Sequence, residues 1–296
     1  MVYGKGPFNR IIDGAILVIL CVITACSLFP LLHILAISFS DKSAVAAGSV
    51  ILWPKGINVA AYRAVIEDKA FFMAFWVSVK RVLLGGGIQF VLTILMAYPL
   101  SREVHVFRSR NVYMWFVVFT MLFSGGLIPW YMTIRDLGLL DSIWALVLPS
   151  AVPVFNVIIL MNFFRGIPKE LDDSAKMDGA GPWRTLMQIY LPLSLPALAT
   201  VTLFSIVTHW NSFFDGLILM NNPSNQPLQT YLNQIVVQFN NSSANMTVDE
   251  IERMSKLSNQ TINSAKILVS MIPILVIYPL LQKYFVSGLT LGSVKE

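Results

Sequence analysis

Six long apolar blocks constrain this chain more than any other feature of its sequence. Each block is of the order of the 20 residues that a helix needs to cross the hydrocarbon of a bilayer, and the first begins near Ile11. Only 12% of the residues are charged, whereas soluble domains carry roughly a quarter. This composition argues against a water-soluble globule. The sequence therefore predicts an all-α integral membrane protein.

We predict six transmembrane helices in a single domain that covers residues 1–296. Their approximate ranges are 11–39, 71–100, 112–132, 143–164, 195–220 and 267–285. An even number of spans places both termini on one side of the membrane. Basic residues are about twofold denser in the segments that share that side, as the orientation rule expects of cytoplasmic loops. The termini are predicted to be cytoplasmic.

The sequence lacks the signals of nucleic-acid binding, ATP binding, metal binding and catalysis. The formal net charge is +5, but the basic residues are scattered between apolar blocks, so no nucleic-acid partner is expected. The run Gly85-Gly86-Gly87 is not followed by Lys-Ser/Thr, so we expect close helix packing there and no ATP site in this chain. The histidines lie on separate segments at 33, 105 and 209. Neither a metal site nor a catalytic constellation is predicted.

The one sizeable inner loop, residues 165–192, carries consistent signals for two short helices. Pro168 and the acidic residues after it are favourable at a helix start. Gly179 can adopt the left-handed conformation that ends a helix, and Pro182 can begin the next one. An apolar stripe at positions i, i+3, i+4 and i+7 follows, formed by Trp183, Leu186, Met187 and Tyr190. Periodicity alone leaves two alternatives: a docking element for a partner, or a hairpin that packs on its own protein.

The spacing of this loop resembles the EAA signature of importer permeases. The matching pattern is Asp173-Ser174-Ala175, three residues, Gly179, nine residues, Ile189, one residue and Leu191-Pro192. Asp173 replaces a glutamate and Ser174 an alanine, which keeps an acid and a small residue. Four further stretches extend the resemblance to a sugar-type ABC importer permease, of the maltose-type second-permease kind and the subgroup that serves complex or acidic oligosaccharides. They are AYPLSR at 97–102, FSGGLIPWYMTIRDLGLLDSIWALVLP at 123–149, HWNSFFDGLI at 209–218 and YPLLQKYFVSGLTLGSVK at 278–295.

The resemblance implies a coupling-helix pair between the fourth and fifth spans, seated in an ATPase subunit. The residues implied in coupling are Glu170, Asp173, Ser174, Ala175, Asp178, Gly179, Trp183, Leu186, Met187, Ile189 and Pro192. It also implies a second homologous permease, two ATPase subunits that hold ATP and Mg, and an extracellular or periplasmic sugar-binding protein. The chain would then have no cofactor of its own and would lie in a bacterial inner membrane, in contact with its lipid.

The function implied is import of oligosaccharides by alternating access, with uronate-containing fragments of alginate or pectin as the acidic candidates. Neutral oligosaccharides are the first alternative. An ion-coupled secondary transporter is the second, but that class usually needs more spans and more carboxylates within them. A membrane-bound enzyme would need the catalytic constellation that the sequence lacks.

Polar residues inside the predicted spans mark either a substrate path or contacts between helices. The fifth span carries a polar face formed by Ser205, Thr208, His209, Asn211, Ser212 and Asp215. In the second span, Lys80 and Arg81 are adjacent cations. Either the span begins near Val82 and the pair reaches outward to water, or one of the two lines a vestibule that attracts acidic sugars. In the outer loop 221–266, Thr247 and Glu250 are typical of the start of a short helix over 248–257.

Overall fold

The computed structural model describes residues 7–244 and 260–292, and the described residues contain helices and no strand. The predicted all-α class is confirmed, while the helix expected over 248–257 lies outside the described residues. Contacts divide the chain into two compact units. The first is Met1–Lys69 with Gln234–Met271, and the second is Ala70–Asn233 with Ile272–Glu296. That the chain acts as one transmembrane domain stays a prediction.

The first unit consists of one long apolar helix followed by a folded loop. It contains α1 (Pro7–Ser38), α2 (Lys42–Ala46) and α3 (Ala60–Glu67), together with parts of α14 (Leu228–Ala244) and α16 (Gln260–Gly292). Apolar residues at the end of α1 pack on the loop, with Ile37, Val45 and Val50 buried. Lys266 and Asp68 form an ion pair at 2.6 Å.

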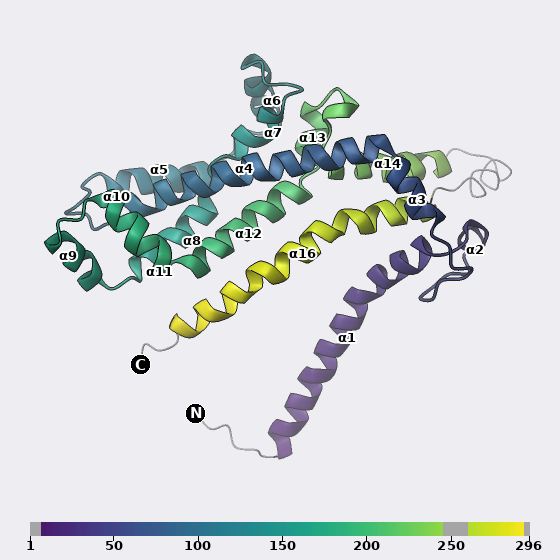
Figure 1. Cartoon of the computed structure of the whole chain (residues 1–296), viewed down its shortest axis with the longest axis horizontal. Coiled ribbons are helices and arrows are strands. Elements are labelled where there is room, and N and C mark those ends of the chain that lie inside the picture. Colours follow the sequence, from purple (N-terminus) through teal and green to yellow (C-terminus); the bar gives the residue numbers. More distant parts are fainter. Residues whose placement is uncertain (1–6, 245–259, 293–296) are drawn as a thin grey trace. The chain divides into compact units, whose positions relative to one another are not determined.

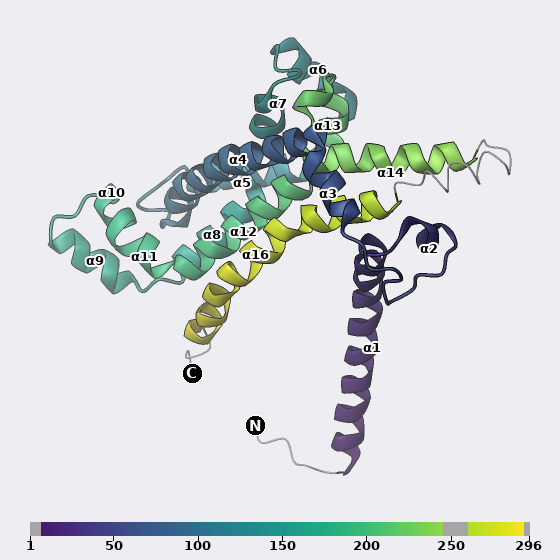
Figure 2. The same ribbon diagram turned by 45° about the vertical axis from the view of Figure 1, so that its right-hand side comes forward.

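The second unit is a helical bundle built mainly on the 33-residue helix α4 (Lys69–Ser101). Its other elements are α5 (Arg110–Leu122), α6 (Leu127–Asp136), α7 (Ile143–Val147), η1 (Leu148–Ser150), α8 (Val154–Arg165), α9 (Lys169–Met177), α10 (Pro182–Thr185), η2 (Leu186–Tyr190), α11 (Leu191–Leu193), α12 (Leu195–Asn211), α13 (Phe214–Leu219) and η3 (Pro223–Asn225). Figures 1 and 2 both show α8 and α12 running beside α4, with α9 and α10 at one end of it and α6, α7 and α13 toward the other.

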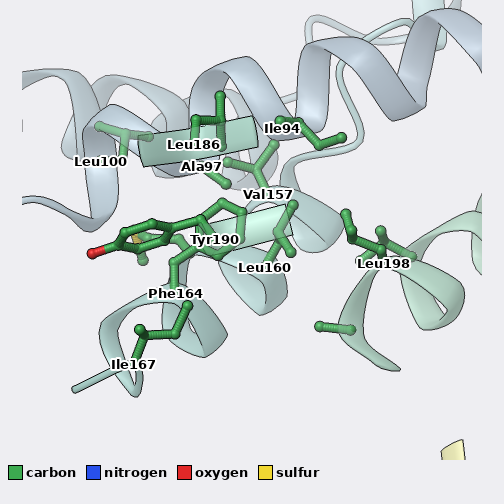
Figure 3. Close-up of a cluster of buried hydrophobic side chains, with 13 residues drawn as sticks. Ile94, Ala97, Leu100, Val157, Leu160, Phe164, Ile167, Leu186, Tyr190 and Leu198 are labelled. Atoms are coloured by element: carbon green, nitrogen blue, oxygen red, sulfur yellow. The ribbon is translucent and has the colours of Figure 1, made fainter. Parts of the chain in front are cut away.

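The main core of the second unit lies where α4, α8, η2 and α12 meet (Figure 3). Leu160 and Phe164 of α8 are fully buried, and Leu186 and Tyr190 of η2 pack on them. The rings of Phe164 and Tyr190 meet edge to face at 5.4 Å between centroids, an arrangement that aromatic quadrupoles favour. This core joins the inner-loop helices to the membrane bundle.

Three described helices are long and apolar enough to cross a membrane, and three bent helix pairs also pass that test. The long helices are Ile11–Ser38, Lys69–Ser101 and Gln260–Gln282, close to the predicted first, second and sixth spans. The bent pairs are Arg110–Leu122 with Leu127–Asp136, Ile143–Ser150 with Val154–Arg165, and Pro182–Leu193 with Leu195–Asn211. The total of six spans stays a prediction, because it counts each bent pair as one.

The third predicted span is not one continuous helix. α5 ends at Leu122 and α6 begins at Leu127, with a bend of 109° between them. The intervening Ser124-Gly125-Gly126 breaks the helix, because Gly126 has a φ of +89° that other residues rarely adopt. The 13 residues of α5 rise about 20 Å, which is less than the roughly 30 Å of hydrocarbon.

The fourth and fifth predicted spans are also interrupted. A bend of 45° separates Ile143–Ser150 from Val154–Arg165, at Pro153, whose ring prevents continuous helical hydrogen bonding. The fifth span was expected to run to residue 220, but α12 ends at Asn211 and α13 starts at Phe214. Side-chain contacts of Asp215, described below, hold this second break.

Of the three adjacent glycines in α4, Gly85 shows the close helix packing expected from the sequence. A Cβ at Gly85 would lie 2.5 Å from Cε1 and Nε2 of the buried His209 ring. A Cβ at Gly86 would meet nothing within 4 Å. The two glycines therefore differ in packing although both lie within the same helix.

We predict that alanine at these two positions affects the thermal stability of the protein differently. Gly85→Ala forces α4 and α12 apart and should lower the thermal unfolding midpoint of the detergent-purified protein by several degrees. Gly86→Ala should leave the midpoint unchanged or raise it, because alanine favours a helix by up to about 1 kcal/mol over glycine. Equal midpoints for the two variants in a thermal scan would contradict this packing.

Candidate functional site

The inner loop forms a short helical hairpin, named here the α9–α10 hairpin (residues 169–185). Its turn has the hydrogen bonds of a Schellman motif. Gly179 N donates to Lys176 O at 3.0 Å, and Ala180 N donates to Ala175 O at 2.8 Å. Gly179 has a φ of +72°, and Pro182 is the first residue of α10. The predicted left-handed end of the first helix and proline start of the second are confirmed.

The apolar stripe predicted on the second helix is divided by the structure. Leu186 and Tyr190 are buried in the core, whereas Trp183 is 64% exposed and Met187 54% exposed. The reason is that Leu186–Tyr190 forms a π-helical turn, in which hydrogen bonds run from i to i+5. The wider turn rotates residues three apart away from each other, so Leu186 and Tyr190 enter the core while Trp183 and Met187 stay exposed, and the expectation of one 3.6-residue stripe was wrong.

The other residues expected to act in coupling lie mostly on exposed surface. Ala175 is buried and Ile189 is half-buried, and the exposed members are Glu170, Asp173, Ser174, Asp178, Gly179 and Pro192. Met177, which was not among the predicted coupling residues, is the preceding neighbour of Asp178 and is 88% exposed. A surface of exposed methionine and tryptophan with neighbouring carboxylates has the composition of a protein-binding patch.

Arg102, directly after the end of α4, joins α4 to the hairpin. Its Nη1 donates to Asp172 Oδ1 of α9 at 2.7 Å and to the Tyr190 hydroxyl at 3.1 Å. Its guanidinium carbon lies 4.1 Å from the ring centroid of Tyr98 and 4.5 Å from that of Tyr190. We call these four residues the Arg102 cluster; they combine an ion pair with two cation–π contacts.

The charges in the Arg102 cluster stabilise one another despite partial burial. Burial disfavours charge on Asp172, but hydrogen bonds from Arg102 and Lys176 outweigh it and hold the pKa of this carboxyl below its usual value. Burial likewise opposes charge on Arg102, yet the Asp172 carboxylate and the two tyrosines raise the pKa of the guanidinium. The ion pair is therefore charged throughout the physiological pH range.

A second polar group, the Arg81 cluster, holds the break between α12 and α13 against α4. Arg81 pairs with both carboxylate oxygens of Asp215, and its Nε donates to His209 Nδ1 at 3.4 Å. Asp215 Oδ1 also accepts from Ser212 Oγ at 2.8 Å and from the N–H of Gly216 at 2.9 Å. A bidentate arginine–carboxylate pair is the usual way to bury such charges.

The structure corrects the interpretation of Lys80 and Arg81. α4 begins at Lys69, so the helix itself does not start near Val82, and where its membrane-spanning part begins stays a prediction. Only Lys80 is exposed; the Arg81 side chain is 3% exposed and neutralised by Asp215. Adjacent residues on a helix point about 100° apart, and this separates the two cations. Arg81 therefore does not reach outward to water.

A cavity of about 840 Å³ opens beside the break between α5 and α6. We call it the α5–α6 cavity; Ser212 and Asp215 of the Arg81 cluster form part of its wall, and Arg81 does not. Its lining residues are Thr120, Met121, Phe123, Ser124, Gly125, Gly126, Leu127, Pro129, Trp130, Thr133, Pro149, Ser212, Phe214 and Asp215. Aromatic faces and hydroxyl groups in one concave wall suit a polar organic ligand with apolar faces.

The remaining polar residues of the fifth span do not meet at this cavity. Ser205 is buried and accepts a hydrogen bond from Asn156 Nδ2 at 3.2 Å, which is a contact between helices. Thr208 and Asn211 are exposed. Within the described part of the chain, no three histidine, cysteine or acidic side chains group as metal ligands would.

The sequence reading missed Tyr98, Asp172 and the role of Arg102. The signal was present in part, because Tyr98 and Arg102 are four apart at the end of an apolar helix and therefore share a face. Nothing local pairs Arg102 with Asp172, which is 70 residues away. The sequence Ser124-Gly125-Gly126 also indicates the break beside the α5–α6 cavity. It lies within the block that was predicted to be one span.

These features define a polytopic helical membrane protein with an exposed helical hairpin. Residues 70–291 match the family described as binding-protein-dependent transport system inner membrane component. The polygalacturonan/rhamnogalacturonan transport system permease protein YtcP of Bacillus subtilis is 41% identical over 97% of this chain and 99% of its own. The protein LplC of the same organism is 39% identical, over 97% and 96%.

A solved structure extends the similarity to the fold. It is a bacterial ABC transporter involved in the import of the acidic polysaccharide alginate, with a TM-score of 0.85 and 32% identity over 96% of this chain and 100% of that one. The chain belongs to the binding-protein-dependent transport system inner membrane component family. It is a transport permease of the ABC type and not an enzyme.

We predict that Arg81 contributes to stability through Asp215 and that Lys80 does not. Arg81→Met leaves a carboxylate without its cation and should cost about 3 to 5 kcal/mol of stability. The double variant Arg81→Met with Asp215→Asn removes both charges and should recover at least half of that loss. Thermal unfolding of the purified protein measures both effects. Lys80→Met is the matched control, and an equal loss in this variant would contradict the assignment.

Proposed function

We propose that this chain is the permease subunit of an importer that carries acidic, uronate-containing oligosaccharides into the bacterial cytoplasm by alternating access. The observation that carries the proposal is its similarity, over nearly its whole length, to a polygalacturonan/rhamnogalacturonan permease, supported by the fold of an alginate importer. A chain of this size does not enclose a path for an oligosaccharide alone. A second permease of similar fold is therefore proposed to complete the path, with an extracellular or periplasmic binding protein delivering the sugar.

The α9–α10 hairpin is proposed to dock into an ATPase subunit. Its exposed face presents Asp173, Met177 and Trp183, and the hairpin is fixed to the membrane bundle through the core around Tyr190 and Phe164. ATP and Mg would act on two such ATPase subunits, outside this chain. This arrangement places the hairpin and both termini in the cytoplasm, in agreement with the density of basic residues there.

The α5–α6 cavity is proposed to be part of the substrate path. Sugar rings have apolar faces that pack on aromatic side chains, which Phe123, Trp130 and Phe214 supply. The charge of Asp215 is balanced by Arg81, so this wall does not repel a uronate as a free carboxylate would. Exposed Lys80 remains a candidate for attraction of acidic sugars.

Transport by the reconstituted complex tests the substrate class. The chain, its second permease, the ATPase subunits and the binding protein are assembled in proteoliposomes, with oligogalacturonates and neutral oligosaccharides of equal length as substrates. We expect ATP-dependent uptake and stimulated ATP hydrolysis for the acidic sugars. Equal uptake of neutral sugars would contradict the substrate class, and ATP-independent uptake by this chain alone would contradict the ABC permease function.

A pair of matched phenylalanine variants tests the cavity. Phe123 lines the α5–α6 cavity and is 63% exposed, whereas Phe116 of α5 is 65% exposed and does not line it. We expect Phe123→Ala to raise the substrate concentration for half-maximal transport by up to about tenfold, since aromatic contacts contribute roughly 0.5 to 1.5 kcal/mol. Phe116→Ala should leave it unchanged. Indistinguishable transport curves for the two variants would show that the cavity is not part of the substrate path.

A further inference from the structure

Two arginines contact other elements of the second unit, Arg102 just beyond the end of α4 and Arg81 within the helix. Arg102 follows its last residue and contacts the α9–α10 hairpin, and Arg81 lies 20 residues before Ser101 and contacts the α12–α13 break. A helix rises 1.5 Å per residue, so roughly 30 Å separate the two contacts. The helix is continuous from Arg81 to Ser101, with Pro99 near its end. One continuous helix therefore links the hairpin with a wall of the α5–α6 cavity.

The contact at the hairpin end resists both sliding and rotation of α4. The Asp172 carboxylate holds the Arg102 fork from α9, while the guanidinium also lies over the rings of Tyr98 of α4 and Tyr190 of η2. The Tyr98 hydroxyl also donates to Pro182 O, the first residue of α10, at 3.0 Å. The end of α4 is thus bonded to α9, α10 and η2. A displacement of the hairpin moves this end with it, because a packed interior deforms little.

The contact at Arg81 involves the cavity itself. Asp215, which binds Arg81, lines the α5–α6 cavity together with Ser212. Leu228 N also donates to Ser78 Oγ of α4 at 2.8 Å, one turn from Arg81. Movement of α4 therefore changes the position of the segment that forms this part of the cavity wall.

We propose that α4 transmits the movement of the α9–α10 hairpin to the α5–α6 cavity, with Arg102 as the positioning residue that connects the hairpin to the helix. The inference rests on the proposed function, in which the hairpin moves with an ATPase. Arg102 does not line the α5–α6 cavity. Its role is to make the accessibility of that cavity depend on the nucleotide state of the ATPase. This is coupling through a physical element that both sites contact.

The test measures cavity accessibility and ATP hydrolysis separately in the complete importer. The two native cysteines are replaced by Cys21→Ser and Cys26→Ser, and Ser124→Cys places one thiol on the cavity wall. Its labelling rate with a membrane-impermeant maleimide is measured without nucleotide and after trapping with ATP and vanadate. We expect the two rates to differ by about tenfold or more with wild-type Arg102, within the usual range of allosteric coupling.

Variants of the Arg102 cluster should abolish this difference while ATP hydrolysis continues. Arg102→Met retains the stem of the side chain but loses the ion pair and both cation–π contacts. Arg102→Lys keeps the charge without the planar fork and should retain only part of the difference. Asp172→Asn weakens the same contact from the α9 side. Arg108→Met, at an exposed arginine of the same loop, is the matched control and should behave as wild type.

The outcomes separate the inference from the proposed function. If Arg102→Met and Asp172→Asn assemble and keep the full difference in labelling, the inference is overturned. If all three cluster variants fail to assemble while Arg108→Met assembles, Arg102 serves assembly and the inference is again overturned. If the wild-type complex itself shows no dependence on nucleotide and no associated ATPase, the failure lies in the proposed function.

Discussion

A charge that is buried within an apolar helix needs a partner, and this constraint organises the second unit of the protein. Arg81 cannot be left alone in hydrocarbon, where an unpaired cation costs several kcal/mol. The carboxylate of Asp215 pairs with Arg81. It lies within reach of the guanidinium because α12 ends at Asn211 and does not continue as a straight helix. The break, the short helix α13 and part of the wall of the α5–α6 cavity all depend on this pair.

A similar pairing just beyond the end of α4 has a different consequence. Arg102 lies just beyond the helix, where it is half-buried and held by Asp172 and two tyrosine rings. Here the cation fixes the α9–α10 hairpin to the bundle, and the π-helical turn Leu186–Tyr190 places Leu186 and Tyr190 in the core. Trp183 and Met187 are left exposed. Arginine thus positions a cavity wall from within α4 and, just beyond the end of α4, the hairpin that is proposed to dock into an ATPase subunit.

Breaks in the helices are part of how such a chain works. The bend between α5 and α6 shortens one span and leaves Gly126 and its neighbours lining a cavity. Irregular backbone at membrane depth is tolerated where it is buried in protein or lines a cavity. The features that depart most from the expected straight spans are therefore the ones that line the cavity proposed to be part of the substrate path.

The sequence by itself determined the helical membrane class, the hairpin turn at Gly179 and Pro182, and the family, because these follow from local hydrophobicity, local backbone preference and fixed motif spacing. It also placed Arg81, His209, Ser212 and Asp215 among the candidate polar residues. Only the tertiary structure decided which of them meet. Arg81 and Asp215 are 134 residues apart, and Arg102 and Asp172 are 70 apart.

No local rule relates such distant residues, so the sequence alone did not determine where the helices break or that Lys80 is exposed while Arg81 is buried. The tertiary structure settled them because a buried charge selects the geometry in which its partner is within reach. The 3.6-residue periodicity predicted for Trp183, Leu186, Met187 and Tyr190 was wrong at η2 for a similar reason. Packing of Leu186 and Tyr190 into the core imposed a turn that the sequence pattern, read at 3.6 residues, does not contain.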